Sequence, residues 1–379
     1  AAAKNVARGE SGGKSGLKKA TESKIKKQTA ERFSVVFSVC TAVGAVAGAG
    51  FLSGRELLEF YGGFRLFPLV VSFAAFAGGF FLFLRLGAKY GGFGNVMRGL
   101  FPGAAAHAAK IAALFGSFVV GAATLSALNA AYPYKPLPAV LFLLIALLFT
   151  RRGISGVSSF GTAFTPFLIV AVLTLIVRRG SFSPPEVTDF PCAARAAVSA
   201  AIYVGMNVFA TCPVLCDLGA TFAGKKRAVA VSFVSAGLLS LLAAAILSAV
   251  SSDKSSYAAP LPLDYVLNGG KFYSLISAVG MLTAFTACFY PVSVAAQKIS
   301  LQKFVKASGV PGAEETFRAR KNAAKIVSAA AFFAVSALPF EALVRYFYPV
   351  AGVAGAAVIV AALCAALSKR RCNAPRAAA

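Results

Sequence analysis

The chain has 379 residues, of which 58% are hydrophobic and only 13% are charged, and its formal net charge is +25. Soluble proteins are about half apolar and about a quarter charged, so this composition excludes an ordinary water-soluble fold and indicates the lipid bilayer as solvent. A strongly basic balance fits nucleic-acid binding or basic cytoplasmic loops, and the positions of the basic residues decide between them.

Residues 1–32 form a polar tail that contains nine Lys and Arg residues and little to bury. This composition predicts a disordered cytoplasmic segment that can touch anionic lipid. The alternative is a secretory signal peptide cleaved after residue 47, but the polar part is long for that role and nine more apolar segments follow. We therefore expect the segment from residue 33 onward to remain as the first membrane span.

Ten apolar segments follow the tail, most of them near the ~20 residues that a bilayer-crossing helix needs. The fourth and the ninth are short and could extend into their flanks. The chain is therefore predicted to be an all-α polytopic membrane protein, with residues 368–379 as a short cytoplasmic tail. The spans are placed at residues 33–60, 66–87, 106–131, 137–150, 157–177, 193–217, 227–250, 271–298, 322–338 and 342–367.

Ten spans put both termini on the same side of the membrane. Placing them in the cytoplasm puts 29 of the 38 Lys and Arg residues on that side, as the positive-inside rule expects. The basic residues thus follow alternate loops rather than one patch, which explains the net charge without nucleic acid. The spans divide into two sets of five, residues 33–177 and residues 193–367.

The first span of each half is irregular. Span one contains Gly44 and the run Gly48-Ala49-Gly50, and span six contains residues 205–207, Gly-Met-Asn, followed by Pro213. Breaks at matching positions of two halves are typical of the binding site of a secondary transporter, because unpaired backbone groups at membrane depth need a ligand, an ion or a cavity. The alternative is close helix packing, since Gly44 and Gly48 form a GxxxG pair.

Three segments resemble the YkvI family of bacterial membrane proteins. Residues 48–56, GAGFLSGRE, resemble its G-[AT]-G-F-A-S-G-[QR]-E motif, residues 203–215 resemble a second motif, and residues 348–352, YPVAG, resemble its Y-P-[IF]-x-G element. That family is placed in the amino acid–polyamine–organocation superfamily. The resemblance therefore implies a bacterial inner-membrane protein with a LeuT-like 5+5 inverted repeat and broken helices one and six.

The resemblance also implies where ligands bind. In that superfamily the irregular parts of spans one and six hold the substrate, which here gives Ala47, Gly48, Ala49, Gly50, Phe51, Tyr203, Gly205, Asn207 and Thr211. A sodium site in LeuT-like folds uses carbonyls of span one and hydroxyls of span eight, which gives Gly44, Ala47, Thr283 and Thr286 as candidates. The usual adjacent hydroxyl pair is missing, because an alanine follows each threonine, so sodium coupling, proton coupling and uniport all stay open.

Charged residues next to the break are candidates for gating or proton coupling, because ionisable groups at membrane depth are usually functional. One arrangement is an external gate in which Arg55 faces Glu341, or Glu56 faces Arg195 or Arg345. A buried Glu56 would also suit a proton carrier, because burial favours the neutral form of a carboxyl group. The alternative is ordinary ion pairing at the membrane interface.

Enzyme signatures are scarce, because a single histidine rules out an HExxH motif and leaves no convincing Ser/His/Asp set. Seven cysteines without a CxxC pair argue against a disulfide framework or a zinc site. Asp217, at the end of span six, is predicted to lie in a solvated loop near Lys225. The sequence thus predicts a secondary active transporter of a small polar solute, an amino acid or related amine, with Na⁺ or H⁺ as the coupling ion and no other cofactor. The alternative is a non-transporting membrane scaffold or sensor on the same fold, and the oligomeric state is left open.

Overall fold

The computed structural model describes residues 35–132, 136–180, 182–187, 189–221, 224–259, 261–268, 270–307 and 314–372. The basic tail, residues 1–32, lies outside these ranges, so its disorder stays a prediction. Within the described ranges the regular secondary structure is helical throughout, as the composition predicts.

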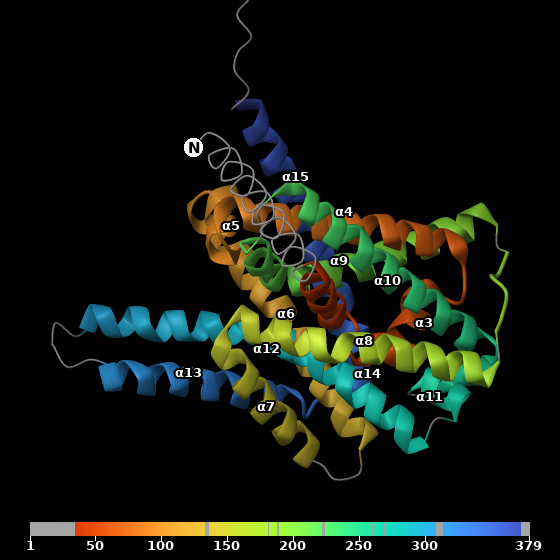
Figure 1. The fold of residues 1–379 in the computed structure, drawn as a ribbon. Helices are drawn as coiled ribbons and strands as arrows, with labels where there is room; N and C mark the ends of the chain where they lie inside the picture. The colour runs from red at the N-terminus through yellow and green to blue at the C-terminus, as the bar shows by residue number, and fades with distance from the viewer. Residues whose placement is uncertain are drawn as a thin grey trace, which may run out of the picture.

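The helices follow one another along the chain with short connections (Figure 1). The first half contains a helix over Val35–Val46, then α2 (Ala49–Ser53), α3 (Arg55–Tyr61), α4 (Leu66–Tyr90), α5 (Phe93–Leu100), α6 (Gly103–Ala131), α7 (Leu137–Phe149), the 3₁₀ turn η1 (Thr150–Arg152) and α8 (Ile154–Arg179). The second half contains α9 (Phe190–Gly219), α10 (Lys225–Ser251), the 3₁₀ turn η2 (Lys254–Ala258), α11 (Pro262–Leu267), α12 (Gly270–Ala307), α13 (Glu314–Val335), α14 (Phe340–Ala342), the π-helical turn η3 (Leu343–Phe347) and α15 (Tyr348–Cys372).

Seven of the predicted spans coincide with helices in the described part of the chain that are long and apolar enough to cross a membrane. They are α4, α6, α8, α9, α10, α12 and the stretch Phe340–Ala365. Among the remaining predicted spans, α7 has only 13 residues, and the first half of α13 is strongly charged. The chain is a multi-pass membrane protein.

The predicted break in span one is present. The first helix ends at Val46, and Gly48 has an extended backbone with φ −84° and ψ −165°. The Gly48 amide donates to the Val46 carbonyl at 2.6 Å, whereas in a continuous helix it would donate to Gly44. A second interruption follows at Gly54, the residue between α2 and α3. Its φ of +78° lies in the left-handed region, which favours glycine.

The predicted break in span six is wrong, because α9 is one continuous helix through residues 205–207 and past Pro213. Gly205 allows close packing of α9, since a Cβ atom there would lie 3.4 Å from the Gly352 carbonyl of α15. The Asn207 side-chain amide donates to the Tyr203 carbonyl at 3.1 Å within the same helix. The small and polar residues of span six therefore serve helix packing and hydrogen bonding within the helix.

The long helices form two groups that contact each other. In one group, α4 packs against α9 and α10, and α3 packs against the same two helices. In the other group, α6, α7, α12 and α13 all contact one another. Helix α8 packs on α12, and α15 packs on α9 and α6. This arrangement places the broken first span, through α2 and α3, between the two groups, because α2 contacts α6 and α12 while α3 contacts α9.

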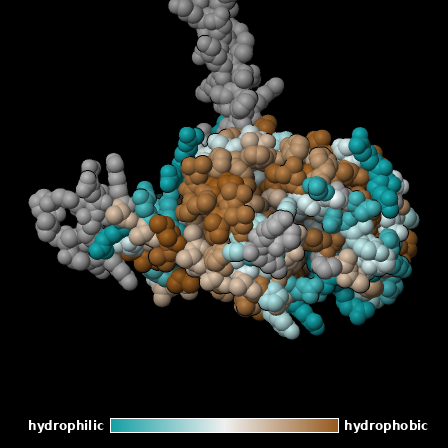
Figure 2. Space-filling model, turned by 90° about the horizontal axis from the view of Figure 1, so that it is seen from below, coloured by the Kyte–Doolittle hydropathy of each residue, from teal (hydrophilic) through white to brown (hydrophobic). Residues whose placement is uncertain are grey.

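Apolar side chains cover much of the surface, as a membrane-spanning protein requires. Figure 2 shows one face, on which apolar residues form a broad patch while hydrophilic residues gather toward the right-hand side. The large exposed apolar side chains of α7 illustrate this surface: Leu137, Val140, Leu141, Leu144 and Leu148.

Candidate functional site

The break in span one lies where three helices approach closely. A Cβ atom on Gly48 would sit 3.1 Å from the Cβ atom of Ala284 in α12 and 3.7 Å from the Thr124 hydroxyl in α6. The side chains of Ala47 and Phe51 on either side are almost fully buried. Glycine at this position therefore lets the unwound segment contact both helices of the opposite group. Thr124 is a neighbour of the break that the sequence did not indicate.

Glu56 is the central polar group of the site. Its side chain folds back over α2, so that a Cβ atom on Gly50 would overlap its carboxyl group. The residue is only 5% exposed. The Tyr203 hydroxyl of α9 donates to Glu56 Oε2 at 3.0 Å, and the Tyr348 side chain of α15 lies near the same carboxyl group. Among the described residues, Glu56 is the one acidic side chain in the buried set.

The expected pairing of Glu56 with Arg195 or Arg345 is wrong. Among the described side chains Glu56 has no basic partner within 4.0 Å, whereas Arg65 and Glu186 form an ion pair at 3.3 Å. Arg345 instead lies over the ring of its neighbour Tyr346. Glu56 points inward between α9 and α15, where the Tyr203 hydroxyl supplies a hydrogen bond of the kind that a buried carboxyl group requires.

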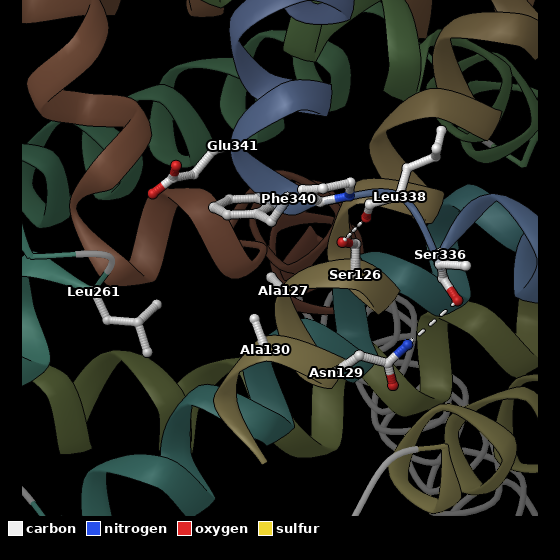
Figure 3. A pocket seen from close by; sticks show the side chains of 11 residues that line it. Ser126, Ala127, Asn129, Ala130, Leu261, Ser336, Leu338, Phe340 and Glu341 are labelled. Atoms are coloured by element: carbon white, nitrogen blue, oxygen red, sulfur yellow. Dashed lines mark hydrogen bonds between the residues drawn. The ribbon is translucent and has the colours of Figure 1, made fainter. Parts of the chain in front are cut away.

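Arg55 and Glu341 lie around one cavity of about 390 Å³. Arg345 and Glu59 also line it, and no ion pair joins these four groups among the described side chains. Arg55 donates to the Tyr257 carbonyl at 3.0 Å instead. A neighbouring cavity of about 450 Å³ also has Glu341 in its wall, with Leu261 and Ala130 nearby (Figure 3). Arg55 and Glu341 therefore lie near each other, and their role as a gate stays a prediction.

The predicted substrate residues of α9 are buried, and the side chains of Asn207 and Thr211 bond within their own helix. Tyr203 and Thr211 are at most 3% exposed, and the Thr211 hydroxyl donates to the Asn207 carbonyl at 2.7 Å. Among the predicted substrate residues of α9, Tyr203 contacts the broken span, because its hydroxyl donates to Glu56. Contact of these residues with a substrate stays a prediction.

The candidate sodium ligands partly converge. A Cβ atom on Gly44 would lie 3.6 Å from the Thr283 Cβ, and one on Gly280 would lie 3.4 Å from the Ala47 carbonyl oxygen. The Thr283 hydroxyl donates to the Gly280 carbonyl at 2.7 Å, which leaves its oxygen lone pairs available to a cation. Oxygen ligands of this kind fit a hard cation.

Thr286, the fourth candidate sodium ligand, and Ala284 add less to the candidate sodium site. The Thr286 hydroxyl donates to Leu282 within α12, and its place in a cation site stays a prediction. Ala284, directly after Thr283, supplies no side-chain oxygen.

Asp217 has a structural role that sequence reasoning missed, because it was expected in a solvated loop. Its Oδ1 accepts the Phe93 amide at the start of α5 at 2.9 Å, and its Oδ2 accepts the Tyr290 hydroxyl of α12 at 3.0 Å. The residue is half-buried. It thus connects α9, in one group of helices, with α12 in the other. A carboxylate at the end of an apolar helix was the available signal, but its partners lie 124 and 73 residues away.

Comparison with known protein families and with characterised proteins finds no match by sequence. Solved structures do match in fold. The structure of MhsT in complex with L-phenylalanine is 11% identical, has a TM-score of 0.53, and the match covers 86% of this chain and 98% of that one.

The structure of Mhp1, a nucleobase-cation-symport-1 family transporter with bromovinylhydantoin bound, is 16% identical with a TM-score of 0.51. That match covers 78% of this chain and 70% of the Mhp1 chain. Both structures have the LeuT fold. The present chain therefore shares the fold of LeuT-type transporters.

Proposed function

We propose that this chain is a secondary active transporter that moves a small polar solute across the membrane by alternating access. The observation that carries the proposal is the break at Gly48, beside which the buried Glu56 carboxyl folds against Gly50. A broken backbone and a buried carboxyl group at membrane depth are costly, and they are retained where they serve a ligand or an ion. The likeness to the folds of MhsT and Mhp1 supports the same function.

The helix contacts support ten spans arranged as two inverted sets of five, residues 33–177 and 193–367. Counted along the chain, α2 belongs to span one, α6, α7 and α8 are spans three to five, and α9, α12, α13 and α15 are spans six, eight, nine and ten. Exchanging each span with the span five places away turns one observed helix contact into another. The contact of α6 with α13 becomes that of α12 with α7, and the contact of α6 with α9 becomes that of α12 with α2. The contact of α15 with α6 becomes that of α8 with α12. Such internal symmetry is expected of transporters built from inverted repeats.

In this proposal the group of α3, α4, α9 and α10 moves against the group of α6, α7, α12 and α13. Glu56 carries the coupling proton, because it is a buried carboxyl group at the junction between the moving group and α15, and its oxygen accepts a hydrogen bond from Tyr203. Sodium at Gly44, Ala47 and Thr283 is the second possibility for coupling, and the close approach of Gly44 to Thr283 favours it.

An amino acid or related amine is the proposed solute class. The resemblance to the YkvI family supports it, as does the amino acid bound to MhsT. The resemblance also supports a place in the bacterial inner membrane, and the distribution of Lys and Arg supports cytoplasmic termini.

The direct test uses the purified protein in liposomes with an imposed proton or sodium gradient. Radiolabelled amino acids and amines are added one at a time, and we expect saturable accumulation of at least one of them with one of the two gradients. Ligand-induced thermal stabilisation of the detergent-solubilised protein should identify the same compound, because binding to the folded state alone raises its stability. Absence of both responses across the panel would contradict transport and favour a scaffold or sensor.

A further inference from the structure

Three basic residues gather where α7 ends against α13. Arg151 lies in the 3₁₀ turn η1 directly after α7, and Lys321 and Lys325 lie one helical turn apart on α13. Lys325 is only 8% exposed. Its Nζ atom lies 3.5 Å from the Thr150 carbonyl oxygen, which is at the outer limit for a hydrogen bond.

Lys321 and Arg151 place positive charge next to Lys325. None of the three basic residues belongs to an ion pair among the described side chains. The Thr150 hydroxyl is occupied, because it donates to the Ala146 carbonyl at 2.7 Å. Clustered cations that repel one another and lack a carboxylate partner are stabilised by a bound anion.

The same cluster borders a surface that faces lipid. Helix α7 has 13 residues, so it is about 20 Å long, shorter than the ~30 Å hydrocarbon core of a bilayer. Its exposed side is apolar, with Leu141, Leu144 and Leu148 each more than half exposed. On α13, which contacts α7, Ile326 and Val327 are 61% and 67% exposed. Cations at the end of a short helix therefore lie directly beside apolar surface.

We propose that this cluster binds an anionic phospholipid. The phosphate lies between Arg151, Lys321 and Lys325, and the acyl chains lie along the exposed apolar sides of α7 and α13. A guanidinium group binds phosphate oxygens in a bidentate manner, and ammonium groups add point charges from other directions. Basic pockets between membrane helices at the cytoplasmic end bind lipid headgroups in this way. The proposal does not depend on the transport function.

The test uses the full-length protein, delipidated in detergent and titrated with phosphatidylglycerol or with phosphatidylcholine of the same acyl chains. Native mass spectrometry counts bound lipid, and thermal unfolding measures its stabilising effect. We expect phosphatidylglycerol to bind and stabilise, and the Arg151→Gln/Lys321→Gln variant to bind it at least roughly tenfold more weakly. Both residues are exposed, so the variant should fold. Lys325→Met, which keeps the side-chain length, should weaken binding in the same direction.

The matched control is Lys225→Gln/Lys226→Gln, which removes the same charge from two exposed residues at the start of α10. It should bind phosphatidylglycerol like the parent protein. Equal loss of binding in the control would overturn the site, because general charge attraction would then explain the effect. Equal binding of phosphatidylcholine would overturn the requirement for an anion. Equal stabilisation by inorganic phosphate would overturn the lipid as occupant in favour of a free anion.

Discussion

At the scale of single residues, Glu56 is the side chain on which the proposed transport cycle depends. The sequence marked it as a carboxyl group just after the break and offered an arginine as one possible partner. The structure gives it a tyrosine donor, Tyr203, from a helix that is far away in sequence, with Tyr348 of α15 nearby. A carboxyl group held by neutral donors can exchange a proton without breaking an ion pair, which suits a group that must alternate between two charge states.

Replacing Glu56 with glutamine tests this role. The Glu56→Gln variant keeps the shape and can still accept from Tyr203, but it cannot ionise. We expect solute exchange at equal pH on both sides to persist, while accumulation driven by a proton gradient falls at least roughly tenfold. Uptake into liposomes measures both. Asp253→Asn, which changes an exposed carboxyl in the η2 loop, is the control, and proton-driven accumulation that survives in Glu56→Gln would remove Glu56 from coupling.

Gly50 is predicted to be required because Glu56 folds over it. A Cβ atom at this position would overlap the carboxyl group, so Gly50→Ala should destabilise the protein by about 1–3 kcal/mol, the usual cost of overpacking. Thermal unfolding in detergent measures the loss. Gly78→Ala in α4 is the matched control, because nothing lies within 4 Å of a Cβ atom there. In a Glu56→Ala background the penalty at Gly50 should shrink, and an unchanged penalty would mean that another contact causes it.

At the scale of helices, the two irregular spans behave differently. Both contain glycine and polar residues, and the sequence treated them as equivalent breaks. Only span one unwinds, because the Gly48 amide turns back to Val46. In α9, Asn207 and Thr211 bond to carbonyls of their own helix, and Gly205 packs on α15. The choice between a break and a packing surface depends on the neighbouring helices, which the local sequence does not encode.

Asp217 also acts at the scale of helices, because it joins α9 to both α5 and α12. We expect Asp217→Asn and Tyr290→Phe to act together, with a coupling free energy of about 0.5–3 kcal/mol in a double-mutant cycle measured by thermal unfolding. Loss of the carboxylate acceptor should also speed hydrogen exchange at the first turn of α5, because the Phe93 amide donates to it. Additive effects of the two substitutions would mean that the hydroxyl–carboxylate bond does not hold the helices together.

At the scale of the whole molecule, the contacts between helices repeat under exchange of the two halves, and the charge distribution predicts which end faces the cytoplasm. Fusions to either terminus test the orientation. We expect green fluorescent protein to be fluorescent, and alkaline phosphatase inactive, at both the N-terminus and the C-terminus in bacterial cells, because both ends are predicted to be cytoplasmic. Active phosphatase at either end would contradict an even number of spans with cytoplasmic termini.

The sequence by itself determined that the chain is a helical membrane protein, where its seven long apolar helices lie and where the first predicted span breaks. These properties follow from local patterns, since hydrophobicity over about 20 residues and the loss of regular backbone bonds at a glycine run act within one helix. Only the tertiary structure decided that α9 stays continuous, that Glu56 accepts a hydrogen bond from Tyr203, and that Asp217 connects three helices. The last two depend on side chains that meet across more than 70 residues of chain, and helix packing, which no local periodicity specifies, brings them together.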